Sequence, residues 1–271
     1  MASRRLQGKV SIVTGSSSGL GRAIALAYSR EGAHVVCADL SAGARAVIEA
    51  ETSANTDDLI RKQGGRAIFV QTDVTKADSW EVLVAAAVKE FGRIDVLVNN
   101  AGISYESKNP PRKIHDTPEE AWDISMAVNG KSVWLGCKYV IGQMLKQEPH
   151  SSGDRGWVIN LSSIYGLVGS RIAPSYAASK GAVANLTRSL ALDYAADRIH
   201  VNAINPGFIR TGMFADTISN IATRDSIDAL HPFGGTGVPE DIAGAAVFLA
   251  SGDASWVTGV NLPVDGGFTA Q

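Results

Sequence analysis

The feature that most constrains the fold is an alternation of short apolar runs with longer amphipathic stretches. Seven runs rich in β-branched residues have the length and composition of buried strands. Helical patterns separate them, which is the β-α-β rhythm of a parallel sheet covered by helices on both faces. We therefore predict an α/β fold, a doubly wound Rossmann fold with a seven-stranded parallel sheet. The predicted strands are residues 10–13, 34–38, 67–71, 94–98, 157–161, 200–204 and 260–264.

Amphipathic stretches predict helices between the strands, among them residues 20–30, 80–91, 121–145, 175–196 and 239–249. Two polar segments, 104–118 with Pro110-Pro111 and 147–155, break the rhythm and are predicted as surface loops. The stretch 208–237 has weak periodicity and is interpreted as a mobile substrate lid.

Length and charge restrict the class of partner. The 271 residues, 45% of them hydrophobic, suffice for one sizeable core, and we expect one domain over 1–271, with a dinucleotide-binding part at about 8–155 and a catalytic part at about 156–271. The 25 basic and 27 acidic residues are well mixed, so no field exists that would hold nucleic acid or an anionic membrane. A small-molecule substrate is the expected partner.

Targeting signals and metal sites are not expected. The start of the chain lacks the apolar core of a signal peptide and no apolar run approaches the length of a spanning helix, so we expect a cytoplasmic protein. Cys37 and Cys137 lie in apolar stretches without metal-ligand spacing, which suits buried packing residues in a reducing compartment. The five histidines share no ligand spacing, so we interpret them as structural or solvated and predict no metal site.

A glycine-rich loop follows the first predicted strand, and the first helix pattern begins inside it. Gly15 permits a tight turn, Gly19 lets the backbone approach a pyrophosphate, and Gly21 lets helix and strand pack. The helix start adds free N–H groups and a positive dipole, which favour a phosphate. The loop predicts a dinucleotide site, whose other loop residues are Ser17, Ser18 and Leu20.

An acid ends the second predicted strand. Asp39 lies 18 residues after Gly21, close to where a carboxylate binds the adenine ribose hydroxyls. Leu40 and Ser41 follow it, with no base to neutralise a 2′-phosphate, so we predict NAD rather than NADP as the cofactor. The alternative interpretation of Asp39 is a helix N-cap.

A tyrosine and a lysine lie four residues apart in a helical stretch. This spacing puts the Tyr176 phenol and the Lys180 ammonium on one helix face, one turn apart. The ammonium and the positive nicotinamide ring both favour phenolate, so we expect them to lower the pKa of Tyr176 toward a useful range.

Together these motifs resemble the short-chain dehydrogenase/reductase family, in its compact single-domain branch. The resemblance covers nearly the whole chain and includes six ordered motifs, each at the carboxyl end of a strand or the start of the next element. Besides the glycine loop and Tyr176-x-x-x-Lys180, they are Asp73-Val74, Asn99-Asn100-Ala101-Gly102, Ser163 thirteen residues before Tyr176, and Asn205-Pro206-Gly207.

The resemblance implies a role for each matching residue. Tyr176 would be the general acid or base, Ser163 would bind the substrate oxygen, and Lys180 would also bind the nicotinamide ribose. Asn129 resembles the helix asparagine that holds a water in a proton relay with the lysine; a mid-helix asparagine can instead bond the backbone. Ser162 competes with Ser163, but the thirteen-residue separation favours Ser163, and Ser162 is expected to face the cofactor or the backbone.

The remaining motifs are expected to hold the two ends of the cofactor. Asp73 and Val74 would contact the adenine, and Asn100, Ala101 and Gly102 would line the adenosine side. The alternative role of these five residues is to form the turns in which they lie. The nicotinamide end would be held by Pro206, Gly207, Ile209 and Thr211.

These observations predict an NAD-preferring alcohol dehydrogenase or carbonyl reductase that interconverts a secondary alcohol and a ketone. An inactive nicotinamide-binding sensor is the alternative, disfavoured because Ser163, Tyr176 and Lys180 are all present; an epimerase or dehydratase would be expected in a longer chain. The sequence leaves the substrate open, because apolar residues and Arg171 and Arg210 occur together in the variable segments. The segment 256–268 resembles a subunit contact, which implies a homotetramer.

Overall fold

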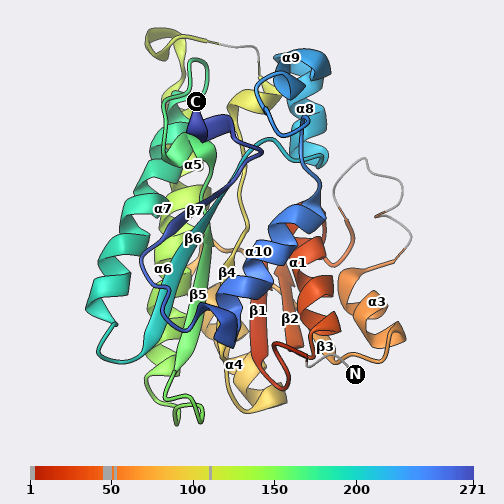
Figure 1. Cartoon of the computed structure of the whole chain (residues 1–271), viewed down its shortest axis with the longest axis vertical. Coiled ribbons are helices and arrows are strands. Elements are labelled where there is room, and N and C mark those ends of the chain that lie inside the picture. The colour runs from red at the N-terminus through yellow and green to blue at the C-terminus, as the bar shows by residue number, and fades with distance from the viewer. Residues whose placement is uncertain (1–3, 45–50, 52–53, 110–111) are drawn as a thin grey trace.

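The computed structural model of the chain describes residues 4–44, 51, 54–109 and 112–271. Met1 to Ser3 at the start of the chain, and Pro110 and Pro111 of the predicted loop 104–118, lie outside the described residues. Its centre is a seven-stranded sheet in the order β3-β2-β1-β4-β5-β6-β7, with every neighbouring pair parallel (Figure 1). The doubly wound α/β fold predicted from the sequence is confirmed. The strands are β1 (Val10–Thr14), β2 (His34–Asp39), β3 (Ala67–Gln71), β4 (Val96–Asn99), β5 (Gly156–Leu161), β6 (Ile199–Pro206) and β7 (Asn261–Val264).

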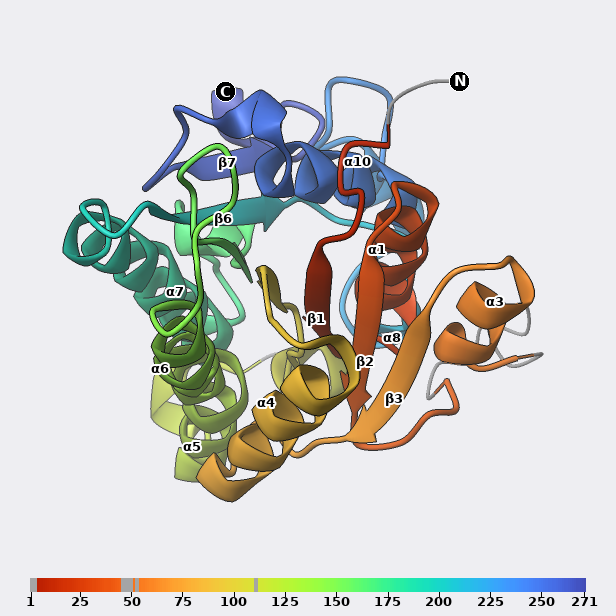
Figure 2. The same ribbon diagram turned by 90° about the horizontal axis from the view of Figure 1, so that it is seen from below.

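Helices cover the sheet on both sides (Figure 2). On one face lie α1 (Gly19–Arg30) and α10 (Pro239–Ala250), with α3 (Thr56–Lys62) near the β3 edge. On the other face lie α4 (Ala77–Phe91), α6 (Ser132–Met144) and α7 (Pro174–Asp193), with α5 (Glu119–Ser125) beside α6 and α7. Each face has its own apolar core, and β1, β4, β5 and β6 are buried along their whole length because both of their faces pack against helices.

The strand order opens a crevice at the centre of the sheet. The chain builds from β1 toward β3 on one side and then returns to β4 on the other side of β1. The loops that follow β1 and β4 therefore diverge at their carboxyl ends, which is where ligands bind in sheets of this kind.

The predicted helix 121–145 is wrong in one respect. It consists of α5, a π-helical segment at Met126–Lys131, and α6. A π-helical turn holds one residue more than an α-helical turn, and periodicity over a long window does not register that insertion. The helix α3, which the sequence analysis did not predict, spans only seven residues.

The segment 208–237, interpreted from the sequence as a lid, contains two short helices, α8 (Gly212–Asn220) and α9 (Arg224–Asp228). Both begin at a threonine whose side-chain oxygen accepts from a backbone N–H three residues on, Thr211 from Phe214 and Thr223 from Ser226. Asn220 of α8 also donates to the Ser107 carbonyl oxygen (3.1 Å), so this segment touches the loop after β4.

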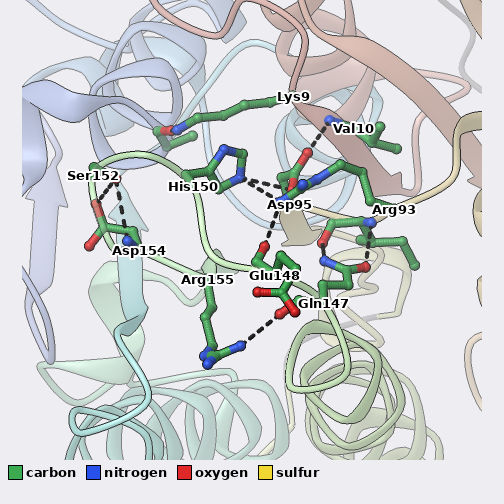
Figure 3. A network of polar contacts seen from close by, with 12 residues as sticks. Lys9, Val10, Arg93, Asp95, Gln147, Glu148, His150, Ser152, Asp154 and Arg155 are labelled. Carbon is green, nitrogen blue, oxygen red and sulfur yellow. Dashed lines mark hydrogen bonds and ion pairs between the residues drawn. The ribbon is translucent and has the colours of Figure 1, made fainter.

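The amino edge of the sheet is closed by a polar network (Figure 3). Asp95, just before β4, has no exposed surface. It accepts from the Val10 backbone N–H (2.8 Å) and from Arg93 Nε (2.6 Å), and its other neighbour is His150 Nε2 (2.9 Å). The loop 147–155, predicted to lie on the surface, is tied to the sheet here: Gln147 bonds both backbone groups of Ile94 (2.8 Å each).

A second carboxylate extends this network under β5 and β6. Asp154 is buried and contacts Arg198 (2.6 Å) and His200 Nε2 (3.1 Å). Trp157 lies between the rings of His150 and His200, and Lys9 Nζ lies 3.1 Å from a Trp157 ring centroid. Burial lowers the pKa of Lys9 to about 8. Two of the five histidines are therefore structural, as expected.

Both cysteines are buried, as predicted, and burial raises the pKa of each thiol to about 12. Among the described residues no group of three or more His, Cys, Asp or Glu side chains could hold a metal ion. Nor does any helix within that part of the chain have the length and apolar character needed to cross a membrane.

Candidate active site

The glycine loop between β1 and α1 needs glycine at each of its three positions. Gly15 and Gly19 have φ values of +65° and +53°, in the left-handed region that favours glycine. A Cβ on Gly21 would overlap the Gly15 carbonyl oxygen and come within 2.6 Å of Asn100 Nδ2. The loop can therefore form only because these residues lack side chains.

The loop presents donors to an anion. Ser18 is the N-cap residue of α1 and gives it no side-chain cap. The Gly19 N–H instead donates to the Glu51 carboxylate (3.0 and 3.2 Å), so an acidic group already lies at the helix start. A helix start whose N–H binds a carboxylate, beside glycine backbone without side chains, has the donors and the geometry that fit a pyrophosphate in place of that carboxylate.

Asp39 lies against this loop. Its Oδ2 accepts from the Ser17 N–H (3.1 Å) and its Oδ1 from the Leu40 N–H (2.7 Å). Residues 40–44 are not helical, so Asp39 does not act as the N-cap considered as an alternative. Ser17 Oγ donates to the Ser41 carbonyl oxygen (2.6 Å), which ties the glycine loop to the chain after β2.

The predicted adenosine residues lie at the carboxyl ends of β3 and β4 and make turn contacts. Asp73 Oδ1 accepts from the Thr75 N–H (3.0 Å) and Oγ1 (2.7 Å), and these bonds lower the pKa of Asp73. Val74 is buried. The Asn100 amide donates to the Thr14 carbonyl oxygen (2.8 Å), and the Ala101 N–H donates to Thr14 Oγ1 (3.0 Å). Asn100 thus fastens the loop after β4 to the glycine loop.

The structure brings the three predicted catalytic side chains together. Ser163 follows β5; its Oγ accepts from the Tyr165 N–H (3.2 Å), and its hydroxyl lies close enough to the Tyr176 phenol to lower the pKa of that phenol. Lys180, one turn further along α7, is buried, with Nζ 5.8 Å from the Tyr176 ring centroid and donating to the Leu161 carbonyl oxygen (2.7 Å). Ser162 Oγ donates to the Lys180 carbonyl oxygen (2.8 Å), so Ser162 faces the backbone, one of the two expected orientations.

The pKa of Tyr176 moves in the direction opposite to that expected. Burial raises it to about 12, the Ser163 hydrogen bond lowers it, and the charges of Tyr165 and Glu106 raise it further. The Lys180 ammonium does not offset this in the protein alone: it lies 5.8 Å from the ring centroid and donates to the Leu161 carbonyl oxygen. Burial lowers the pKa of Lys180 to about 8.

Asn129 lies in the π-helical segment and is completely buried. Its side chain bonds both backbone groups of Ile103 (2.9 Å each) and donates to Ser179 Oγ (3.0 Å). These are the backbone contacts considered as the alternative to a relay. A Cβ on Gly102 would lie 3.2 Å from Asn129 Oδ1 and 3.5 Å from Lys180 Nζ, so both polar atoms border Gly102.

The loop after β6 closes the other side of the crevice. Thr211 is the N-cap residue of α8, and its Cγ2 would be 3.4 Å from a Cβ on Gly19, so this loop meets the glycine loop. A Cβ on Gly207, which follows Pro206, would lie 3.0 Å from His231 Nε2. Ile209 is buried and forms a bridge to Gly237.

Two contacts here were missed from the sequence. His231 Nε2 accepts from the Phe208 N–H (3.2 Å) and its Nδ1 donates to the Ile227 carbonyl oxygen (2.9 Å), which fixes the loop to α9. Phe268 lies 6.2 Å from Tyr165 and 6.4 Å from Phe208 between ring centroids, so it joins an aromatic cluster with them and Phe214. No local pattern signals the His231–Phe208 and Phe268–Tyr165 contacts, because the partners are 23 and 103 residues apart along the chain.

Comparison with known proteins agrees with the fold. A family model described as enoyl-(acyl carrier protein) reductase matches residues 15–269. The chain is 40% identical over 262 residues to a cis-4-hydroxycyclohexanecarboxylate dehydrogenase of Sinomonas cyclohexanicum, with 97% of each chain covered. It is also 40% identical over 264 residues to 3beta-hydroxysteroid dehydrogenase 1 of Eggerthella lenta, with 97% of this chain and 95% of the relative covered.

Solved structures match over the full length. A short-chain type dehydrogenase/reductase from Mycobacterium marinum superposes with a TM-score of 0.87 at 29% identity, covering 99% of this chain and 98% of the other. An Agrobacterium tumefaciens protein assigned as a 2-deoxy-D-gluconate 3-dehydrogenase, solved with bound NADP, has a TM-score of 0.83 at 35% identity and covers all of both chains.

The chain belongs to the short-chain dehydrogenase/reductase family. The predicted reaction class, NAD(P)-dependent oxidoreduction at a CH–OH group, is thereby confirmed.

Proposed function

We propose that this protein is a dehydrogenase that prefers NAD(H) and interconverts a secondary alcohol on a carbocyclic ring with its ketone, with Tyr176 as general acid and base. The observation that supports it most is the junction of three side chains: Ser163, which is close enough to Tyr176 to lower the pKa of its phenol, Tyr176 itself, and Lys180, whose ammonium lies 5.8 Å from the centroid of the phenol ring. The junction lies at the carboxyl edge of the sheet, the edge at which the glycine loop begins α1.

The nicotinamide cofactor supplies or accepts the hydride when bound. The glycine loop would hold its pyrophosphate, with Ser17, Ser18, Gly19 and Leu20 around it. Asp39 and Leu40 would bind the adenine ribose, and Asp73, Val74 and residues 100–102 the adenosine. Pro206, Gly207, Ile209 and Thr211 would orient the carboxamide end.

The protein residues manage the proton. In ketone reduction the Tyr176 phenol donates its proton to the carbonyl oxygen, while Ser163 hydrogen-bonds the same oxygen as charge develops on it. Because burial raises the pKa of Tyr176 to about 12, the phenol is protonated at neutral pH and ready to donate. In alcohol oxidation it must accept that proton, so oxidation should accelerate as the pH rises. Lys180 would bind the nicotinamide ribose. Asn129 would hold the relay water only through the remaining lone pair of Oδ1, because both of its Nδ2 hydrogens are donated to Ile103 and Ser179.

The walls beside the junction favour a ring-shaped apolar substrate. Tyr165, Phe208 and Phe268 present aromatic faces and edges, with centroid separations of 6.1 to 6.4 Å. Such a cluster matches the apolar ring of a cyclic alcohol. The names of both 40% identical relatives describe alcohols on carbon rings.

The test is the Tyr176→Phe variant assayed with a panel of cyclic alcohols and ketones, by nicotinamide absorbance. We expect turnover to fall by about 10³-fold or more, with coenzyme affinity within twofold of wild type. Tyr139→Phe is the matched control, because Tyr139 lies on α6 with its hydroxyl bonded to Glu81. Substantial turnover in Tyr176→Phe would exclude Tyr176 as the acid and base.

The preference for NAD is a separate part of the proposal. Asp39 at the end of β2 supports it, because its carboxylate would repel a 2′-phosphate; the NADP-bound relative is a reason to measure it. We expect kcat/KM to be higher with NADH than with NADPH. The Asp39→Asn variant should lower the ratio of these two kcat/KM values about tenfold. An NADPH preference in the wild type would overturn this assignment.

We further propose that the chain works as one domain over residues 1–271 and as a homotetramer in the cytoplasm. Exposed apolar side chains support the assembly, since Trp256, at the start of the segment 256–268, is 93% exposed. A hollow of about 540 Å³ between α6 and α7 exposes further apolar surface, lined in part by Met126, Trp134 and Leu186. Light scattering of the purified protein measures the number of subunits.

A further inference from the structure

One buried carboxylate beside the proposed catalytic residues has no role in the mechanism above. Glu106 lies in a short 3₁₀ helix (Glu106–Lys108) in the loop after β4, and only 7% of its surface is exposed. Its Oε1 accepts from the backbone N–H groups of Ser175 (3.1 Å) and Tyr176 (3.2 Å). A residue 70 positions away in the chain therefore holds the first turn of α7.

The helix α7 needs such a contact. Its N-cap residue is Ala173, whose methyl side chain cannot accept a hydrogen bond, and Pro174 follows at the first helical position. The next two N–H groups, of Ser175 and Tyr176, would lack side-chain partners at a helix start. Glu106 supplies the acceptor, and its negative charge also matches the positive end of the helix dipole.

The contact reaches the reacting phenol within one residue. Tyr176 is both the group whose N–H is bound and the proposed acid and base, so the position of its backbone is set directly by Glu106. The charged and titratable groups that face the phenol are Glu106, Tyr165 and Lys180; of these, Glu106 and Tyr165 raise the pKa of Tyr176. Burial of the site strengthens the effect of the Glu106 charge.

The second carboxylate oxygen of Glu106, Oε2, is buried, and within the described residues no protein donor reaches it. Glu106 borders a cavity of about 20 Å³ that is also lined by Asn109 and Arg112, and this volume is sufficient for one water molecule.

We propose that Glu106 is a positioning residue for the reaction: it caps α7 from the loop after β4, fixes the backbone of Tyr176, and keeps a carboxylate at the helix turn that carries the phenol. This inference rests on the proposed function, in which Tyr176 exchanges the proton. It predicts two separable effects, one of the hydrogen bond and one of the charge.

Two variants separate these effects. Glu106→Gln retains an oxygen acceptor but removes the charge, whereas Glu106→Ala removes both. Glu120→Gln, on the exposed surface of α5, is the control for loss of one negative charge elsewhere. The pH profile of kcat/KM for alcohol oxidation, coenzyme affinity, and hydrogen exchange of the first turn of α7 are measured for all three and for the wild type.

We expect Glu106→Gln to shift the limb of the profile that follows Tyr176 to lower pH by roughly 0.5–1 unit, with coenzyme affinity within twofold of wild type. Glu106→Ala should also lose about tenfold or more in kcat and exchange its first-turn amides about tenfold faster. Glu120→Gln should match the wild type in all three. A purely structural cap would change exchange and stability but leave the pH profile of Glu106→Gln unmoved, and that result would overturn the proposal.

Failure of the proposed function gives a different pattern. In that case Tyr176→Phe keeps its turnover, or the wild type converts no member of the panel. The exchange measurement needs no turnover, so wild-type exchange rates in Glu106→Ala would overturn the capping role even then. A wild-type enzyme silenced by Tyr176→Phe, with an unshifted Glu106→Gln profile, refutes the inference alone.

Discussion

Replacing Asp95 with alanine tests how the amino edge of the sheet is held together. Asp95 has no exposed surface and joins β1, through the Val10 N–H, to Arg93 and to His150 of the loop 147–155 (Figure 3). Alanine removes all three contacts at once. The backbone bond from the Asp95 N–H to the Val10 carbonyl oxygen (2.8 Å) remains, so the sheet loses the side-chain link between β1 and the start of β4 at this edge.

The magnitude follows from the exposure of the three partners. The Val10 N–H is buried and would lose its acceptor, which costs about 1–3 kcal/mol. The side chains of Arg93 and His150 are 32% and 25% exposed, so water can replace much of their contact with Asp95. The loss of each of these two contacts should therefore cost about 0–1 kcal/mol of stability. We expect Asp95→Ala to lower the free energy of unfolding by about 3 kcal/mol, near the lower end of the range for breaking a buried ion pair.

The effect should depend on pH in a defined direction. Burial alone would raise the pKa of Asp95, but hydrogen bonds from His150, Val10 and Arg93 outweigh it, so the pKa lies below its usual value. A carboxyl with a lowered folded-state pKa stabilises the protein fully above its unfolded pKa, near 4, and loses that contribution as the pH falls through the folded value. The difference between wild type and Asp95→Ala should therefore be constant at neutral pH and shrink below about pH 4.

The assay is urea unfolding followed by tryptophan fluorescence at one fixed protein concentration. Asp58→Ala is the control, because the Asp58 side chain is 44% exposed and pairs with Arg61 on the surface of α3; it should change stability by less than about 1 kcal/mol. An Asp95→Ala protein as stable as this control at pH 7 would refute the reasoning.

Two further predictions concern the thiols and the glycine loop. Cys37 and Cys137 should resist a thiol reagent in the native protein and both react after unfolding, because burial raises their pKa values to about 12; fast labelling of either in the native state would contradict this. Gly21→Ala should weaken coenzyme binding about tenfold or more, since its Cβ would lie within 2.6 Å of Asn100 Nδ2 and overlap the Gly15 carbonyl oxygen. Gly244→Ala is the control, because a Cβ at this position of α10 meets nothing within 4 Å. This control should bind coenzyme normally and be more stable than the wild type by about 0.5–1 kcal/mol. Equal coenzyme affinity in the two glycine variants, measured by fluorescence titration, would show that the loop tolerates a side chain.

The strands were predictable because their signal is local. Each predicted strand lies within two residues of the observed bounds at both ends, and β3 matches at both ends, since a strand buried between helices must be apolar along most of its length. The boundaries that were missed have non-local causes. Pro206 belongs to β6 because β7 pairs with it, and β7 is far away in the sequence.

The predicted catalytic residues share a different kind of signal. Tyr176 and Lys180 are fixed relative to each other by one helix, so their spacing alone places them on one face. Ser163 comes near them because β5 ends beside α7. In contrast, Glu106 and His231 act through contacts over 70 and 23 residues, and no pattern near either one indicates its partner.

The direction of the Tyr176 shift could not be predicted from spacing. The sequence identifies the neighbouring lysine but not how deeply the phenol is buried, and burial is the largest contribution to its pKa. The helices in the segment 208–237 could not be predicted for a similar reason. Its two helices are only nine and five residues long, so tertiary contacts rather than periodicity decide that they form.

The π-helical segment Met126–Lys131 makes this region sensitive to chain length. Asn129 reaches Ile103 and Ser179 only in a helix that carries one surplus residue. Deleting a single residue there would let the segment return to regular α-helix and rotate α6 by about 100° around the helix axis. A homologue with a one-residue gap in this helix should therefore lack the hydrogen bonds that Asn129 makes here, as should a homologue in which the asparagine itself is replaced.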